Sequence, residues 1–393
     1  MAATIEDQLA DLRSRSLLRR LRTFDSPQQP EIEEAGRRLV SFASNDYLGL
    51  ANEPALREAA KAAIDRYGVG SGSSRLICGT LAPHTQLEET LARFKGTEAA
   101  LTFSSGYATA LGAIGSLCKE EDVIILDKLC HASLIDGARL SGATMRVFPH
   151  NHMGKLESHL EWAASEAPDG RILIVTEAVF SMDGDRALLP EITALKNRFG
   201  AMLLVDEAHA VGVLGRNGRG LADALRLEGE VDIQMGTLSK ALGVAGGYIA
   251  GSRRLIELLI NRARSFIFST APPPALAAAA TAALEILMSD EGEGRRTKLW
   301  ENLAHFAGEM PHLFSDGREI QSPIVPIIVG DSGRALEAAD RLTERGFHVP
   351  AIRYPTVARD AARLRISICA SHAPQQISAL CTALRAVQPR AGT

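Results

Sequence analysis

Lys240 is the residue of this chain best placed for covalent chemistry. It lies between an apolar run at 231–235 and a glycine-rich run at 243–247, and Asp206 and His209 follow another apolar run upstream. A lysine amine can form a Schiff base with pyridoxal 5'-phosphate, and a carboxylate can keep the ring nitrogen of that cofactor protonated. The combination predicts an enzyme of amino-acid carbon chemistry that uses this cofactor.

Further polar residues follow predicted strands in the same way. Ligands of open α/β sheets bind beyond the carboxyl ends of the strands, and five consecutive predicted strand ends here carry polar residues. We therefore expect one shared site, formed by the following residues: Gly106 and Tyr107; Asp127 and His131; Glu177, Ser181 and Asp183; Asp206 and His209; Thr237 and Lys240.

Each of these residues also has an ordinary structural interpretation. A lone lysine is usually at the surface, and a lone strand-end acid is usually a helix cap. His131 alone is more often packed or exposed than bound to a ligand, and His209 and Ser181 could merely bond backbone. The ordinary interpretation is weak for Asp206, because a carboxylate that ends a strongly apolar strand is costly to bury without a cation.

Gly106 opens a predicted helix directly after two serines. The free N–H groups and the dipole of a helix N-terminus attract phosphate, so Gly106 and Tyr107 are the expected phosphate-binding residues. The glycine-rich run at 68–74 is a weaker candidate, because it follows a predicted helix rather than a strand.

Strand-like and helix-like segments alternate from residue 99 onward. The predicted strands are 99–103, 123–126, 145–148, 172–176, 202–205, 231–235 and 247–250, and the predicted helices are 106–117, 132–141, 154–165 and 190–198. This order predicts an α/β fold with a large, mainly parallel seven-stranded sheet and helices on both faces.

The two ends of the chain differ from this central part. Residues 3–23 have the leucine spacing of a helix. Towards the C-terminus, 324–329 and 364–368 resemble strands, and 333–345 and 374–387 resemble helices. We expect an N-terminal helical arm at 1–45, a large cofactor-binding α/β domain at 46–288 and a small α/β domain at 289–393.

Arg353 and Arg365 are the best anion-binding candidates of the small domain. Alternation along the strand places Arg363 and Arg365 on one face, opposite Leu364 and Ile366. That face could simply be exposed and polar. A guanidinium also binds a carboxylate through two parallel hydrogen bonds, which is useful to an amino-acid enzyme.

Composition and charge argue against several classes of function. The 393 residues carry a formal net charge of −4 without a basic block, so nucleic acid is not an expected partner. No apolar run is long enough to span a membrane. The five cysteines form no C-x-x-C pair and the N-terminus is acidic, unlike a signal peptide, so we expect a cytoplasmic protein with reduced thiols and no metal site.

Six stretches together resemble the α-oxoamine synthases, fold-type-I pyridoxal phosphate enzymes that condense an amino acid with an acyl thioester. The matching residues are 44–50 (SNDYLGL), 131–133 (HAS), 176–185 (TEAVFSMDGD), 206–209 (DEAH), 237–240 (TLSK) and 268–273 (FSTAPP). The match runs along nearly the whole chain. It implies the fold-type-I architecture and a homodimer with active sites at the subunit interface.

The resemblance implies catalytic roles for residues already named. Lys240 would carry the cofactor and then act as the base on the amino-acid α-carbon. Asp206 would bond the pyridine nitrogen, and His131 would stack on the ring. Ser181 and His209 would approach the phenolic oxygen.

The resemblance also implies which residues bind the phosphate and the substrates. The phosphate ligands would be Gly106, Tyr107 and Thr237, with Ser269 and Thr270 reaching it from the second copy of the chain. The substrate-binding residues would be Arg19, Asn45, His131, Arg353, Thr356 and Arg365. Arg365 would bind the amino-acid carboxylate, and Arg19 the distal carboxylate of the acyl chain.

Within the family, the chain is most similar to the biotin-pathway branch, which joins L-alanine to a pimeloyl thioester of coenzyme A or of a carrier protein. Arg19, Arg20 and residues 351–357 carry that similarity. Residues 74–80 are also similar to the branch that joins glycine to acetyl-CoA. Because one fold can carry several functions, an aminotransferase and a non-catalytic binding protein stay open as well.

Overall fold

The computed structural model describes residues 4–315, 317 and 319–387. The chain forms two compact units. The larger unit contains Leu48–Ser181 and Asp185–Arg296, and the smaller unit contains the described residues of 1–47, 182–184 and 297–393. The smaller unit is therefore assembled from three separate parts of the chain. The division into domains at 45/46 and 288/289 stays a prediction.

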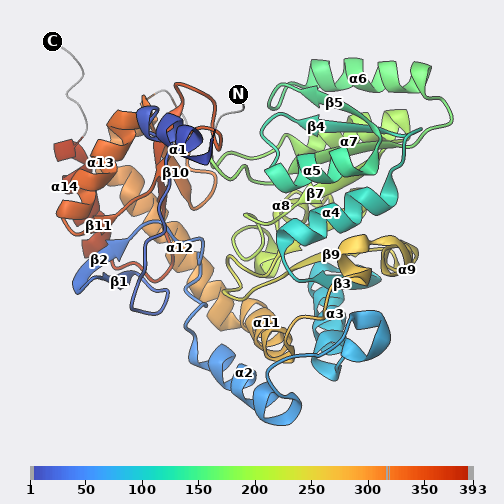
Figure 1. The fold of residues 1–393 in the computed structure, drawn as a ribbon, viewed down its shortest axis with the longest axis horizontal. Coiled ribbons are helices and arrows are strands. Elements are labelled where there is room, and N and C mark those ends of the chain that lie inside the picture. The colour runs from blue at the N-terminus through green and yellow to red at the C-terminus, as the bar shows by residue number, and fades with distance from the viewer. Residues whose placement is uncertain (1–3, 316, 318, 388–393) are drawn as a thin grey trace. The chain divides into compact units, whose positions relative to one another are not determined.

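A seven-stranded sheet forms the centre of the larger unit (Figure 1). Its strands are β3 (Ala99–Phe103), β4 (Val123–Asp127), β5 (Thr144–Phe148), β6 (Ile172–Glu177), β7 (Met202–Asp206), β8 (Ile233–Thr237) and β9 (Gly247–Gly251). They lie in the order β3-β9-β8-β7-β6-β4-β5. β9 is antiparallel to both neighbours, and the other pairs are parallel. The predicted α/β fold with a mainly parallel seven-stranded sheet is confirmed.

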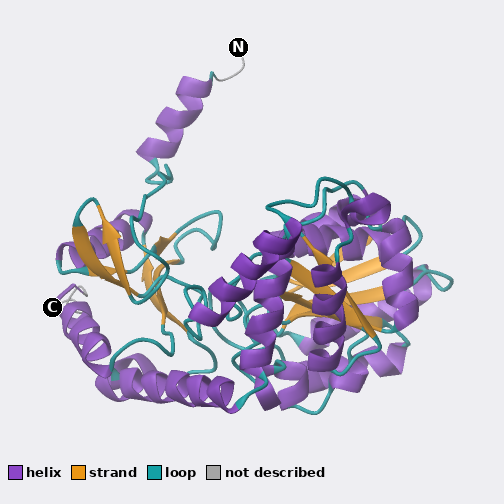
Figure 2. Ribbon diagram, turned by 90° about the horizontal axis from the view of Figure 1, so that it is seen from below, coloured by secondary structure: helices purple, strands orange, loops and turns teal. Residues whose placement is uncertain are grey.

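Helices cover both faces of this sheet (Figure 2). They include α4 (Gly106–Leu117), α5 (Ala132–Ser141), α6 (Met153–Glu166), α7 (Leu189–Phe199), α8 (Leu221–Ala224), α9 (Arg253–Arg262) and α10 (Arg264–Ile267). β4 and β6 are buried along their whole length, because helices on both faces leave them no solvent-exposed side. Apolar side chains of the sheet and of α4, α5, α9 and α10 form one continuous core.

In the larger unit, α11 (Pro274–Leu287) packs against both α2 (Pro54–Tyr67) and α3 (Ala82–Lys95). A π-helix at Arg75–Gly79 lies between α2 and α3 in the sequence. Next to it, an antiparallel bridge joins Ser74 to Thr270. None of the helices in the described ranges is long and apolar enough to cross a lipid bilayer.

Two three-stranded sheets form the smaller unit. One contains β1 (Glu31–Glu34), β2 (Arg37–Ser41) and β11 (Phe347–His348), and the other contains β10 (Ile324–Gly330), β13 (Ala362–Ser367) and β12 (Ala351–Ile352). The helices of this unit include α1 (Ile5–Ser14), α13 (Ser332–Glu344) and α14 (Pro374–Val387). The boundary with the larger unit falls inside α12 (Asp290–Glu309).

The long helix predicted at 3–23 is wrong beyond residue 14. α1 ends at Ser14, and Ser16 has a positive φ of 54° (Ala3 lies outside the described residues). Arg22, which continues the helical pattern in sequence, instead bonds Glu34 of β1 and His348 of β11. Tertiary contacts therefore override the local propensity of this segment.

Candidate active site

Three neighbouring strands of the larger unit end in buried polar residues. Glu177, Asp206 and Thr237 are the last residues of β6, β7 and β8. The register pairs Glu177 directly with Asp206. The three residues are 2 %, 6 % and 5 % exposed. The carboxyl end of the sheet, where the sequence predicts a site, thus holds polar groups that are withdrawn from water.

Lys240 and His209 lie together at this end of the sheet. Lys240 Nζ is 2.7 Å from His209 Nε2. His209 comes three residues after β7 and Lys240 three residues after β8. Because β7 and β8 are parallel neighbours, the segments that follow them leave the sheet at the same edge, and the two side chains meet there. An amine at this distance from an imidazole can exchange a proton with it.

The Asp206 carboxylate is buried beside these groups. Its Oδ1 accepts a hydrogen bond from the Ala208 N–H at 2.9 Å. Burial raises the pKa of Asp206, whereas Lys240, the Ala208 N–H and His131 act to lower it. A buried carboxylate of this kind is stabilised by a cation. The protonated ring nitrogen of pyridoxal phosphate is such a cation, so the residues present fit this cofactor.

His131 precedes α5 and caps its first turn. Its Nδ1 lies 2.8 Å from Ser133 Oγ and accepts a hydrogen bond from the Ser133 N–H at 3.3 Å. Burial lowers the pKa of His131, although the nearby Asp206 acts in the opposite direction. An uncharged imidazole in a fixed orientation is suited to stacking on a flat ring. Stacking on the cofactor stays a prediction.

The first turn of α4 lies close to the last residue of β8 and the first residue of β9. A Cβ added to Gly106 would lie 3.6 Å from the Thr237 side chain, and a Cβ added to Gly247 would lie 2.8 Å from Gly106 Cα. Position 247 therefore tolerates no side chain. Thr237 Oγ1 donates to Gly246 O at 2.9 Å. The start of α4 and Thr237, both predicted to bind phosphate, are thus brought together.

The other predicted cofactor residues are Tyr107, in the first turn of α4, and Ser181, Ser269 and Thr270, outside the helices of the larger unit. Tyr107 donates its phenol to Asp136, so its predicted contribution to phosphate binding is its backbone N–H. Ser181 lies beyond β6 in the sequence, and its approach to the cofactor stays a prediction. Ser269 and Thr270 lie where the chain bridges to Ser74. Their contribution to the site of a second copy also stays a prediction.

Arg365 and Asn45, two predicted substrate residues, are in contact in the smaller unit. Arg365 Nη2 donates to Asn45 Oδ1 at 3.1 Å, and Nη1 donates to Ser367 Oγ at 2.8 Å. The phenol of Tyr47 also donates to Asn45 Oδ1, at 3.2 Å. β13 is buried on both faces. The interpretation of Arg363 and Arg365 as an exposed polar face is therefore wrong.

Arg19, Arg353 and Thr356 also lie together in the smaller unit. Arg19 Nη2 donates to Thr356 Oγ1 at 3.3 Å and to Tyr354 O at 3.4 Å. Arg353 is 8 % exposed and donates to Ser16 O. Burial, and then the charge of Arg19, lower the pKa of Arg353. Two guanidinium groups this close to each other favour an anion beside them.

Glu177 and Asp183 also follow a predicted strand and have no role assigned from the sequence. Glu177 Oε1 accepts a hydrogen bond from the His131 N–H at 2.5 Å. Burial, and then the neighbouring Asp206, raise the pKa of Glu177 to about 8. Asp183 pairs with Arg363 at 2.6 Å within the smaller unit. The position of Glu177 directly after an apolar strand, next to the strand that ends in Asp206, is the signal that identifies it.

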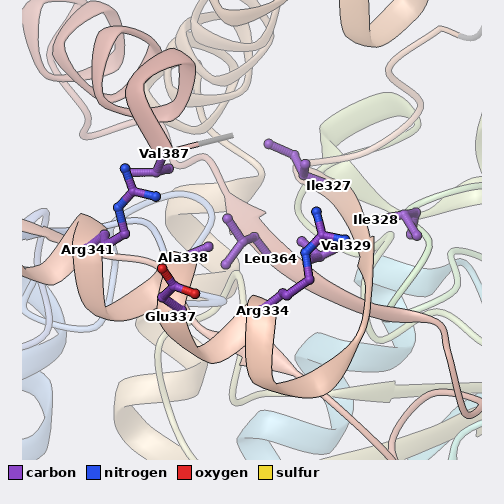
Figure 3. A pocket seen from close by; sticks show the side chains of 9 residues that line it. All are labelled: Ile327, Ile328, Val329, Arg334, Glu337, Ala338, Arg341, Leu364 and Val387. Atoms are coloured by element: carbon purple, nitrogen blue, oxygen red, sulfur yellow. The ribbon is translucent and has the colours of Figure 1, made fainter. Parts of the chain in front are cut away.

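A cavity of about 340 Å³ lies in the smaller unit. Arg334 and Arg341 of α13 flank it, and Ile327 and Leu364 form part of its apolar wall (Figure 3). None of the predicted site residues lines it. In the part of the chain that the structure describes, no group of three or more His, Cys, Asp or Glu side chains is arranged to hold a metal ion.

Comparison with known proteins identifies the family of this chain. The family model of the class I and II aminotransferases matches residues 37–384. The 8-amino-7-oxononanoate synthase of Geobacter sulfurreducens is 49 % identical over 372 residues, which cover 95 % of this chain and 94 % of that protein. The protein of the same name from Thermoanaerobacter pseudethanolicus is 44 % identical over 384 residues, with 98 % and 96 % covered.

Solved structures are similar along the same length. A serine palmitoyltransferase from S. paucimobilis with a bound PLP–myriocin aldimine has a TM-score of 0.90 at 31 % identity and covers 98 % of this chain and 96 % of its own. The 8-amino-7-oxononanoate synthase from Francisella tularensis has a TM-score of 0.74 at 31 % identity, with 89 % and 98 % covered. Since the family model and the relatives match nearly the whole chain, it belongs to the class I and II aminotransferase family and, within that family, to the α-oxoamine synthases.

Proposed function

We propose that the chain catalyses the decarboxylative condensation of L-alanine with a pimeloyl thioester in biotin biosynthesis. The products are 8-amino-7-oxononanoate, carbon dioxide and the free thiol carrier, either coenzyme A or a carrier protein. One observation carries the proposal: Lys240 and His209 are in contact beside the buried Asp206, in a chain that is 49 % identical to a curated 8-amino-7-oxononanoate synthase.

Pyridoxal 5'-phosphate is the cofactor, and residues of the larger unit would hold it. Lys240 Nζ would bind it covalently, Asp206 would face the ring nitrogen, and the start of α4 with Thr237 would bind the phosphate. When bound, the cofactor supplies a ring that stabilises negative charge on the amino-acid α-carbon.

The protein side chains would then handle the protons and the charge. Lys240 Nζ would remove the α-proton, and His209, 2.7 Å away, could exchange a proton with that amine. A carbon–carbon bond forms between the α-carbon and the acyl carbon, and the carbon–sulfur bond breaks. The alanine carboxylate leaves as carbon dioxide. One proton returns to the α-carbon and one ends on the thiol. The α-proton taken up by Lys240 supplies one of them and water supplies the other, so the atoms balance.

The smaller unit would supply the anion-binding residues. Arg365, which Asn45 helps to orient, would bind the alanine carboxylate through two parallel hydrogen bonds. Arg19, with Arg353 and Thr356 beside it, would bind the distal carboxylate of the pimeloyl chain.

We also propose a cytoplasmic homodimer as the working form. Val69, Ile77 and Phe268 are 79 %, 79 % and 71 % exposed, and the segments that carry them meet at the Ser74–Thr270 bridge. Exposed apolar side chains on adjoining segments are typical of protein interfaces. Ser269 and Thr270 lie on the same segment as Phe268, which supports a contribution to the site of the second copy.

Product mass spectrometry tests the reaction directly. The purified protein with pyridoxal phosphate is given alanine, glycine or serine together with pimeloyl-CoA, pimeloyl carrier protein or acetyl-CoA. We expect 8-amino-7-oxononanoate and carbon dioxide from alanine with a pimeloyl thioester. Faster thiol release from glycine and acetyl-CoA would instead support the glycine-using branch. A keto acid from alanine would indicate an aminotransferase, and a colourless protein that releases no thiol would indicate a binding protein.

A further inference from the structure

We propose that Glu177 is a positioning residue of the cofactor site: its protonated carboxyl group fixes the backbone that carries His131 and leaves Asp206 as the ionised acid. The inference rests on the proposed function only in that His131 and Asp206 face the cofactor. Glu177 itself acts through these two residues.

The contact with His131 is the first observation. Glu177 Oε1 accepts the His131 N–H at 2.5 Å, and Glu177 is 2 % exposed. His131 is the N-cap residue of α5, so its N–H has no partner within that helix. A buried N–H without an acceptor is costly. Glu177 therefore fixes the point from which the His131 ring projects.

The position beside Asp206 is the second observation. Glu177 and Asp206 are direct Cα partners on the parallel strands β6 and β7. Side chains of such partners project to the same side of a sheet, so two buried carboxyl groups lie next to each other. Neighbouring buried carboxyl groups cannot both ionise at low cost, and one of them keeps a proton.

The charges around the pair decide which group keeps the proton. The groups that act on Glu177 are Asp206 on β7, Lys240 after β8, Asp127 on β4, and Cys130 and His131 before α5. Burial and Asp206 raise the pKa of Glu177 to about 8, so it is mostly protonated at neutral pH. Asp206 receives the Ala208 N–H, and the favourable charge of Lys240 is the largest of the effects that lower its pKa. For Glu177 the repulsion by Asp206 outweighs the effect of Lys240. Asp206 is therefore the acid that stays ionised.

Two substitutions of Glu177 distinguish the effect of the hydrogen bond to the His131 N–H from the effect of the Glu177 charge. Glu177→Gln keeps an oxygen for the His131 N–H but is never ionised, and Glu177→Ala removes both properties. Glu161→Gln, at an exposed position of α6, is the matched control. For each variant we would measure the thermal midpoint, the Kd of pyridoxal phosphate by fluorescence, and the pH titration of the absorbance of the bound cofactor between pH 6 and 10.

The expected pattern is specific. At pH 7 the Kd of Glu177→Gln stays within about threefold of the parent, whereas that of Glu177→Ala rises about tenfold or more because the His131 N–H loses its acceptor. The parent and Glu161→Gln show an absorbance transition near pH 8, which Glu177→Gln lacks.

Two results would overturn the inference: a Kd of Glu177→Gln as weak as that of Glu177→Ala, or an unchanged transition near pH 8 in Glu177→Gln. If Glu177→Ala does not fold, the titration of Glu177→Gln decides alone. Cofactor binding is measured without substrate, so failure of the proposed reaction would be seen separately in the product assay.

Discussion

Asp127 and Asp206 are the last residues of two apolar strands of the same sheet, yet the surroundings of the two carboxylates differ. They are 1 % and 6 % exposed, and each accepts a backbone N–H two residues further on. Asp127 also accepts the Asn151 N–H at 2.9 Å and lies 3.1 Å from His150 Nδ1. Within the described ranges, no cation forms an ion pair with Asp206. The end of β4 thus has a counter-ion in direct contact, whereas the charge of Lys240 acts on Asp206 without an ion pair.

The difference lies in His150, which a loop brings between Asp127 and Asp185. Burial acts to lower the pKa of His150, but the hydrogen bonds with the two acids raise it to about 10. Asp127 is therefore neutralised by a histidine cation, and Asp206 remains available for a ligand cation. A strand-end acid becomes a candidate ligand-binding group where the fold places no cation in direct contact with it.

Replacement of Lys240 should lower the activity more than any other substitution, because this residue would both bind the cofactor covalently and act as the base. We expect Lys240→Ala to lower kcat by at least about three orders of magnitude. Steady-state thiol release measures this loss, and Lys298→Ala, at a partly exposed position of α12, is the control. Substantial turnover by Lys240→Ala would contradict the assigned role.

Parallel changes of the two acids test the comparison itself. Asp206→Asn should lower kcat/KM by at least about 100-fold, since a neutral amide cannot keep the ring nitrogen protonated. Asp127→Asn should instead lower the free energy of unfolding by about 3 kcal/mol, because it leaves His150 with one acid partner fewer. Kinetics and urea denaturation of both variants provide the measurements. If the two variants lost the same activity and the same stability, the distinction between Asp127 and Asp206 would be wrong.

The pH dependence of stability should isolate His150. Its pKa in the folded protein is about 10, above the value of 6.5 for a free histidine. The stabilisation is therefore complete below about pH 6.5 and is lost as the pH rises through 10. We expect His150→Gln to cost on the order of 2 kcal/mol at pH 6, a value reduced for partial solvent screening, and little at pH 10 or above. A cost that does not change with pH would show that His150 is uncharged.

The smaller unit offers a second comparison, with a smaller expected effect. Arg363 pairs with Asp183, whereas Arg365 contacts the uncharged oxygens of Ser367 and Asn45. We expect Arg365→Lys to raise the KM for alanine about tenfold, because lysine loses the two parallel hydrogen bonds to a carboxylate. Arg363→Lys should change the free energy of unfolding more than the KM. An unchanged KM for Arg365→Lys would exclude Arg365 as the carboxylate ligand.

The strands, and the site residues that directly follow them, depend on short-range sequence patterns and were predictable from the sequence. Apolar runs located the seven strands of the large sheet, although β8 begins two residues later than the predicted run at 231–235. His209 and Lys240 follow two parallel neighbouring strands and therefore meet at the same edge of the sheet. The strand-end rule therefore suffices for the centre of the candidate site.

Features that depend on distant contacts were not predictable in this way. β2 pairs with β11, which lies about three hundred residues further along the chain, and both strands are short. The counter-ion role of His150 and the proton on Glu177 depend on which buried charges become neighbours after folding. Residue type and spacing carry no information about such neighbours.

The most direct test of the central claim is to locate the lysine that carries the cofactor. The protein is incubated with pyridoxal phosphate, reduced with borohydride, digested and mapped by mass spectrometry across its eight lysines. We expect the phosphopyridoxyl group on Lys240. A label on another lysine, such as the exposed Lys128 beside Asp127, with Lys240 unmodified, would contradict the claim.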